Sequence, residues 1–198
     1  MASRNGGNLM HRKTFRDMQC PIARSLERVG EWWSILILRE AGYGTTRFDD
    51  FQRRLDIAPN MLTRRLNALV EEGLLARRQY CDRPPRFEYV LTDAGRDFRP
   101  VLWALLAWGN RHFAPEGIAA QLVDRETGEV VEPVVVDAVT GVRLDPKRHV
   151  PTAGPVANES MRARLARAAE FAATQSLTAD DASASQAEDI SEEASVSR

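Results

Sequence analysis

The sequence predicts a mainly α-helical α+β fold with one small β-hairpin in residues 18–114, followed by a smaller extension. Three observations support this prediction. Apolar residues recur at helical spacing between residues 20 and 72. Two strand-like runs follow, and a Pro-Pro dipeptide separates them. A further apolar helical segment then continues to about residue 113.

Two helices are expected at the start of this domain. The first begins at Pro21 and ends at Gly30, because proline suits the first helical turn and glycine suits the end. Its apolar residues are Ile22, Leu26 and Val29. Residues 32–40 are apolar on nearly every side and indicate a buried helix, with a strand as the alternative.

The next two helices are separated by a break of three residues. Thr46 and Asp49 resemble a capping box at the start of the third helix. Residues 56–58 break it, and Pro59 takes the favoured first position of a fourth helix that ends before Gly73. The apolar faces of these two helices comprise Phe48, Phe51 and Leu55, then Leu62, Leu66, Leu69 and Val70. Two short amphipathic helices with such a turn form a helix-turn-helix.

A β-hairpin and a long helix complete the domain. Residues 74–80 and 87–91 are predicted strands, joined by a loop that holds both prolines because proline cannot donate to a ladder. Thr92 is expected to cap the following helix, and Pro100 to restart it near residues 97–99. This order of elements describes a winged helix-turn-helix domain, with the hairpin as the wing.

Beyond residue 114 the sequence repeats itself. The pattern V-D-x-x-T-G-x-x-x-x-P begins at Val123 and again at Val136, and predicts twin β-hairpins within residues 115–155. Asp and Thr stand where a zinc ribbon would carry thiols, so our hypothesis is that valine packing holds the hairpins without metal or cofactor. Residues 156–176 predict an amphipathic helix and residues 177–198 a disordered acidic tail, while residues 1–17 form an N-terminal arm.

Charge is divided unevenly along the chain. Residues 1–113 hold 19 Lys and Arg against 13 Asp and Glu, whereas residues 114–198 hold 8 against 15. A basic first half favours a polyanionic partner, and the alternative is a chance division between a domain and a solvating tail. No apolar run is long enough to cross a membrane, and the first residues lack the apolar core of a secretory signal, so we expect a cytoplasmic protein.

The fourth helix is the candidate site. If its leucines face inward, its opposite flank is polar and can bind base edges in a major groove of double-stranded DNA. Arginines of the wing suit contacts with phosphates or the minor groove. An ordinary solvated surface is the alternative for this helix taken alone. The predicted DNA-binding residues are Asn60, Thr63, Arg64, Asn67, Arg47, Arg77, Arg83 and Arg86.

Residues 18–113 also resemble the HxlR-type transcriptional regulators. The motifs that carry the resemblance are C-P-I at 20–22, V-G-x-x-W, I-L-R-E, R-F-x-x-F, M-L-T-R-R-L, E-E-G-L, P-P-R-x-E-Y-x-L-T-x-x-G and L-x-x-W-G. The resemblance implies a homodimer that binds an inverted repeat, usually as a repressor, with terminal helices at the dimer seam. Two residues depart from the family pattern: Trp32 replaces a basic residue, and Ala58 replaces a Ser-like cap.

The terminal helix carries more large apolar groups than a small core can bury, which favours dimerisation over a place in the core. The predicted interface residues are Phe98, Leu102, Leu105, Leu106 and Trp108. Two-fold symmetry of the dimer then predicts that the two half-sites of the operator lie about one turn of the DNA helix apart.

Two cysteines are candidate thiol sensors for an oxidant or a small-molecule effector. Cys20 lies at the start of the first helix, where the helix dipole favours a thiolate, and some members of the resembled family sense through this position. The alternative is a small half-buried apolar side chain. Cys81 is expected to be exposed at the wing tip.

Two other classes of function compete with DNA binding. An enzyme with Cys20 as nucleophile would need a base, and His11 and the other two histidines lack a supporting Asp or Asn pattern, so we predict no enzymatic activity. A winged helix that docks a protein partner is the other alternative. Salt distinguishes it, because DNA binding weakens steeply as salt rises.

Overall fold

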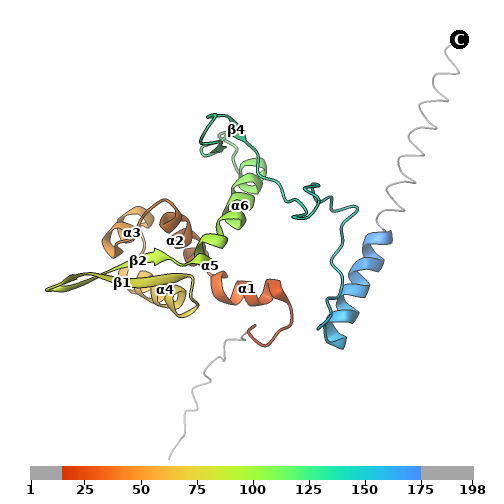
Figure 1. Cartoon of the computed structure of the whole chain (residues 1–198), viewed down its shortest axis with the longest axis horizontal. Helices are drawn as coiled ribbons and strands as arrows, with labels where there is room; N and C mark the ends of the chain where they lie inside the picture. Colours follow the sequence, from red (N-terminus) through yellow and green to blue (C-terminus); the bar gives the residue numbers. More distant parts are fainter. Residues whose placement is uncertain (1–14, 175–198) are drawn as a thin grey trace, which may run out of the picture. The chain divides into compact units, whose positions relative to one another are not determined.

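The computed structural model describes residues 15–174, so the predicted N-terminal arm lies largely outside them and the predicted acidic tail wholly so. The chain divides into two compact units, residues 1–133 and 134–198. The first unit contains every element of the winged-helix domain together with the first repeat hairpin (Figure 1). No helix within residues 15–174 is long and apolar enough to span a membrane.

The first unit begins with four helices. They are α1 (Pro21–Val29), α2 (Trp32–Gly42), α3 (Phe48–Leu55) and α4 (Pro59–Glu71). As predicted, α1 and α4 each begin with proline, and Asp56 takes a left-handed backbone with φ of 49° between α3 and α4. The helix-turn-helix predicted at this break is therefore confirmed.

The start of α3 differs from the prediction. Its N-cap is Arg47 rather than Thr46, and no side chain caps it. The backbone of Arg47 forms a β-bridge with Glu88, and the Thr46 carbonyl accepts a hydrogen bond from Tyr89 at 2.7 Å. Pairing with the wing therefore holds this segment in an extended backbone conformation. A capping pattern in the local sequence gives no information about such pairing.

The core lies among α2, α3, α4 and the base of the wing. Trp32 is the exception to the predicted burial of α2, because 75% of it is exposed at the first position of that helix. The buried apolar residues are Val29, Ile37, Leu38, Phe51, Ile57, Leu62, Leu66, Leu69, Leu74, Leu75 and Tyr89.

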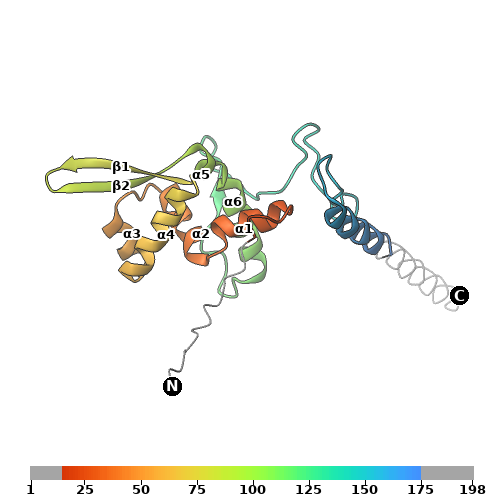
Figure 2. The same ribbon diagram turned by 90° about the horizontal axis from the view of Figure 1, so that it is seen from below.

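The wing consists of β1 (Leu75–Asp82) and β2 (Pro85–Leu91), which pair antiparallel. The strands are longer than predicted, and only Arg83 and Pro84 remain in the loop; Pro85 pairs with Asp82 as the first residue of β2. Proline is tolerated there because the first residue of a strand need not donate to the ladder. Figure 2 shows the wing projecting beyond α3 and α4.

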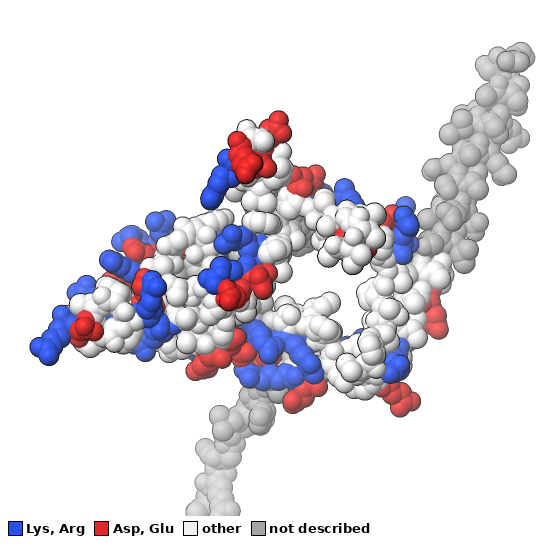
Figure 3. All heavy atoms as spheres, viewed as in Figure 1, with Lys and Arg blue, Asp and Glu red and all other residues white. Residues whose placement is uncertain are grey.

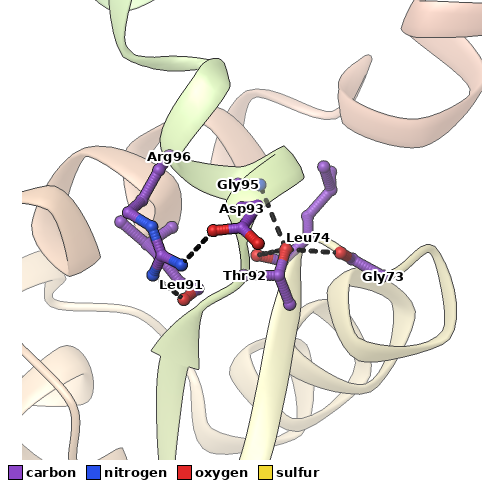
Figure 4. Close-up of polar contacts among 7 residues, drawn as sticks. All are labelled: Gly73, Leu74, Leu91, Thr92, Asp93, Gly95 and Arg96. Carbon is purple, nitrogen blue, oxygen red and sulfur yellow. Dashed lines mark hydrogen bonds and ion pairs between the residues drawn. The ribbon is translucent and has the colours of Figure 1, made fainter.

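The helix after the wing restarts as predicted. Helix α5 (Asp93–Asp97) ends before Phe98, and α6 (Arg99–His112) begins with Pro100 in its first turn. Thr92 caps α5, because the Gly95 N–H donates to its hydroxyl oxygen at 3.1 Å. The Thr92 hydroxyl in turn lies 2.6 Å from the Gly73 carbonyl oxygen, so one side chain joins the end of α4 to the start of α5 (Figure 4).

The first repeat hairpin packs against α6. Strands β3 (Leu122–Val123) and β4 (Val130–Val131) pair antiparallel, as the repeat predicts. The Asn110 side-chain amide donates to the Ala120 carbonyl at 2.8 Å, and Arg111 pairs with Glu132 at 2.5 Å. These contacts fix the hairpin to the second half of α6.

The second unit repeats the turn of the first hairpin. Val136 and Arg143 form a β-bridge around the second V-D-x-x-T-G loop, and residues 159–174 are helical. Asp137 in this loop accepts hydrogen bonds from the Val139 amide at 2.9 Å and the Thr140 hydroxyl at 2.8 Å.

Valine packing does not hold the repeats together as hypothesised. The repeat valines that flank the loops, among them Val123, Val130 and Val136, are all exposed. Side-chain hydrogen bonds within each loop organise it instead. The first repeat therefore forms a hairpin and the second a turn closed by one β-bridge, while the stabilising interaction differs from the hypothesis.

Candidate nucleic-acid interface

Helix α4 presents a polar outer face. Leu62, Leu66 and Leu69 are completely buried on its inner side. The four residues predicted to read bases, Asn60, Thr63, Arg64 and Asn67, are all exposed on the opposite side. The Thr63 hydroxyl donates to the Pro59 carbonyl at 2.9 Å, which orients the side chain and leaves its oxygen lone pairs outward.

Aromatic rings of the wing hold two of the predicted arginines. The Arg47 guanidinium carbon lies 4.8 Å from the centre of the Tyr80 ring, and that of Arg77 lies 3.6 Å from the centre of Phe87. Such cation–π contacts restrict the rotamers of a long side chain while its N–H groups stay accessible. Both arginines are exposed.

Arg83 and Arg86 lie at the wing tip. Arg83 is in the loop and Arg86 is the second residue of β2, and both are exposed. Arg78 is also exposed but pairs with Glu88 at 2.8 Å, which reduces its availability for a phosphate. Figure 3 shows basic side chains gathered toward the outer end of the wing.

In each of the two double-arginine sequences of the helix-turn-helix, one arginine forms an ion pair and the other is exposed without an ion-pair partner within residues 15–174. In α3, Arg53 pairs with Asp50, whereas Arg54 is exposed and has no ion-pair partner within residues 15–174. In α4, Arg64 is exposed, whereas Arg65 is buried and pairs with Glu31. Sequence reasoning did not select Arg54, although its place just before the turn suits a phosphate contact.

Glu72 at the end of α4 is partly neutralised by two arginines. Glu72, the C-cap residue, pairs with Arg16 and with Arg28, the latter at 3.3 Å. These partners come from α1 and the segment before it, so periodicity within α4 gave no sign of them. These arginines therefore weaken the repulsion between the Glu72 carboxylate and a nearby phosphate.

Within residues 15–174, no element covers the outer face of α6. Leu105 and Trp108 are exposed, Leu102 and Leu106 are half-buried, and none of the residues of α6 is buried. Phe98 packs against the core. Leu106 also lines a groove between α6 and the first repeat hairpin. The predicted interface therefore comprises Phe98 at the core and four more accessible residues along α6.

Both cysteines carry free thiols. Cys20 is the N-cap residue of α1, as expected, and is half-buried without a side-chain capping bond. Cys81 is half-buried rather than exposed, because β1 continues through it and its Sγ lies 3.7 Å from the Arg83 carbonyl oxygen. Their response to oxidants stays a prediction.

Asp124 and Asp137 organise the two repeat loops by similar hydrogen bonds: Asp124 accepts from two backbone N–H groups, and Asp137 from one backbone N–H and one hydroxyl. The backbone N–H groups of Thr127 and Glu126 hold the pKa of Asp124 below 3.8, the ordinary value for aspartate. The Val139 N–H and the Thr140 hydroxyl lower the pKa of Asp137 in the same way. Among the residues that the structure describes, no group of three or more His, Cys, Asp or Glu side chains could hold a metal ion.

Comparison with known proteins gives consistent matches. A family model described as HxlR-like helix-turn-helix matches residues 28–117. The uncharacterised HTH-type transcriptional regulator Rv3095 of Mycobacterium tuberculosis is 39% identical over 135 residues, which cover 68% of this chain and 85% of that protein.

Two solved structures are similar over most of the chain. PA1374, a candidate transcription factor of Pseudomonas aeruginosa, is 59% identical, covers 74% of this chain and 100% of its own, and superimposes with a TM-score of 0.54. PA1607, another candidate transcription factor, is 36% identical, covers 72% of this chain and 100% of its own, and gives a TM-score of 0.65.

Proposed function

Because the chain belongs to the HxlR-like helix-turn-helix family of DNA-binding transcriptional regulators, we propose that it is a homodimer that binds an inverted-repeat operator in double-stranded DNA and represses transcription there. The observation that carries this proposal is the division of α4. Its leucines are completely buried while its polar flank is exposed beside a basic wing. We call α4 the recognition helix from here on.

Base edges and phosphates are proposed to be contacted by different residues. Asn60 and Arg64 lie one turn apart on the recognition helix, so they reach neighbouring base pairs of a major groove. Arg83 and Arg86 at the wing tip bind phosphates or the minor groove, and Arg54 joins them as a phosphate contact at the end of α3. Phosphate contacts position the protein, whereas base contacts specify the sequence.

The homodimer is proposed to form along α6. This helix exposes Trp108 and Leu105 although an isolated soluble domain covers most of such groups. A two-fold axis at α6 places two recognition helices on successive major grooves, which is the geometry that an inverted repeat requires. Occupation of a promoter by such a dimer excludes RNA polymerase, and repression follows. We propose that the dimer works in the cytoplasm.

Two alanine variants test the division between base and phosphate contacts. Arg64→Ala should reduce the preference for the operator over random DNA by about 1 to 3 kcal/mol, because a bidentate contact with guanine is lost. Arg83→Ala should weaken binding to both duplexes alike. Fluorescence anisotropy with an operator selected from a random pool measures both affinities. Equal losses on the two duplexes for Arg64→Ala would contradict the proposal.

A further inference from the structure

The recognition helix carries a buried arginine next to the exposed one. Arg64 faces solvent, whereas only 7% of Arg65 is accessible. The Arg65 guanidinium pairs with Glu31, the N-cap residue of α2, at 2.9 Å between Nη2 and Oε2. Two neighbouring arginines therefore have different surroundings, and the buried one links α4 to the start of α2.

Stability is a weak reason for the Arg65–Glu31 ion pair, in which Arg65 is buried. Ions lose their hydration on burial, and replacement of a buried pair by apolar side chains of similar volume is often neutral or stabilising. Within residues 15–174 the Nε of Arg65 is buried and has no hydrogen-bond partner, which adds the cost of an unsatisfied donor. An apolar side chain at this position would avoid both costs. The role of the pair therefore lies in the geometry that it imposes.

A second ion pair lies on the same flank of α4. Arg65, Ala68 and Glu72 follow one another at helical spacing, and Glu72 pairs with Arg28 of α1 at 3.3 Å. All four line an open cleft of about 370 Å³ between α1, α2 and α4. Within residues 15–174 this flank of α4 borders the cleft, so apolar packing constrains it less than the inner face, whose leucines are completely buried. Charge-assisted hydrogen bonds are directional, so the two ion pairs are suited to fix the orientation of this flank of α4.

We propose that Arg65 is a positioning residue for DNA recognition. Through Glu31, and supported by the Glu72–Arg28 pair, it fixes the rotation of the recognition helix about its own axis. The side-chain ends of a helix lie about 5 to 6 Å from the axis, so a rotation of about 20° moves them by about 2 Å. Such a shift exceeds the tolerance of a hydrogen bond to a base edge. This inference rests on the proposed function, because it concerns the exposed face of α4 that carries Asn60 and Arg64, which we call the reading face.

A paired variant separates positioning from folding. Glu31→Gln with Arg65→Met removes both charges of this ion pair together. We expect an unchanged or higher melting temperature, and unchanged affinity for a random duplex with an unchanged salt slope, because Arg65 contacts no phosphate. The preference for the duplex that the wild-type protein selects from a random pool, over a scrambled duplex of equal composition, should fall about tenfold, the equivalent of one weakened base contact.

Two further variants complete the test. Arg39→Met with Glu40→Gln removes another half-buried pair, at 2.9 Å on α2, and should leave the preference intact. Arg65→Lys keeps the charge and should restore part of the preference lost in the double variant. Full wild-type preference in the Glu31→Gln, Arg65→Met protein would overturn this inference alone, as would equal losses of stability and of all DNA binding. A wild-type protein that enriches no sequence would overturn the proposed function, and the inference with it.

Discussion

At the scale of single residues, the joint between the recognition helix and α5 depends on two small residues, Thr92 and Gly95. Thr92 accepts the Gly95 N–H and lies against the Gly73 and Leu74 carbonyls at 2.6 and 3.2 Å (Figure 4). Gly95 is buried, and a Cβ atom at this position would lie 2.1 Å from the Leu74 carbonyl oxygen. The close approach of the two segments therefore requires glycine for its size rather than for its backbone freedom.

Gly95→Ala should lower the free energy of unfolding by about 1 to 3 kcal/mol, because the added methyl group must displace the backbone at Leu74. Urea denaturation of the purified protein measures the change. Gly42→Ala is the matched control, since a Cβ at Gly42, the last residue of α2, meets no atom within 4 Å. The control should be neutral or stabilising by up to about 1 kcal/mol. Equal effects of the two substitutions would refute the proposed role of Gly95.

At the scale of elements, α6 has an apolar face that no other element of the described part of the chain covers. Its hydrophobic residues were predicted to form a seam, and the structure leaves Leu105 and Trp108 exposed along it. The first repeat hairpin covers only part of the second half of α6, through Asn110 and Arg111. The remaining face is available for a second copy of the chain.

Leu105→Glu should convert a dimer into a monomer at micromolar concentrations, because a carboxylate in an apolar seam loses its hydration without gaining a partner. Sedimentation velocity measures the molecular mass. Val139→Glu adds the same charge in the second unit, where 92% of the valine is exposed, and should leave the mass unchanged. A wild-type protein that sediments as a monomer would refute the proposed seam.

The repeat loops should respond to acid in a defined direction. A lowered pKa means that the folded loop favours the ionised carboxylate, so this contribution is present above pH 3.8 and is lost as the pH falls below it. The amide chemical shifts of Glu126 and Thr127 should therefore move toward unstructured values in that acidic range. Asp124→Ala should give such shifts at neutral pH, while Glu126→Gln should not. Unchanged shifts in the Asp124→Ala protein would contradict the assigned role.

At the scale of the whole molecule, the charge division of the chain has a structural counterpart. The excess of 19 basic over 13 acidic groups falls in residues 1–113, which contain the recognition helix and the wing. Several arginines of this part are paired internally, among them Arg53, Arg65 and Arg78. The exposed arginines of α3, α4 and the wing therefore provide the positive field that attracts a polyanion.

Salt distinguishes a DNA-binding protein from a protein-docking module. The logarithm of the affinity should fall linearly with the logarithm of salt concentration, with a slope of about −0.9 for each phosphate contact. Arg83→Ala should reduce the slope by about one contact. Affinity that is independent of salt would favour docking to a protein.

Deletion of residues 177–198, which hold six acidic groups and Arg198, should leave the affinity unchanged if the tail only aids solubility.

The sequence by itself determined the type and order of the elements in the winged-helix domain and the outward placement of Asn60 and Arg64. It did so because helical periodicity, proline and glycine act over a few residues. It also located the repeat loops. The extent of the wing strands, the cap of α3 and the surroundings of Cys81 were predicted incorrectly, since each depends on pairing between distant segments.

Only the tertiary structure decided which arginines face solvent and which are paired. Arg64 and Arg65 are adjacent and chemically identical, yet one lies on the reading face and the other pairs with Glu31 from another helix. A one-dimensional pattern records the helix face of a residue but not the charge that a neighbouring element places against it. Ion pairs are contacts between elements, and folding brings their partners together.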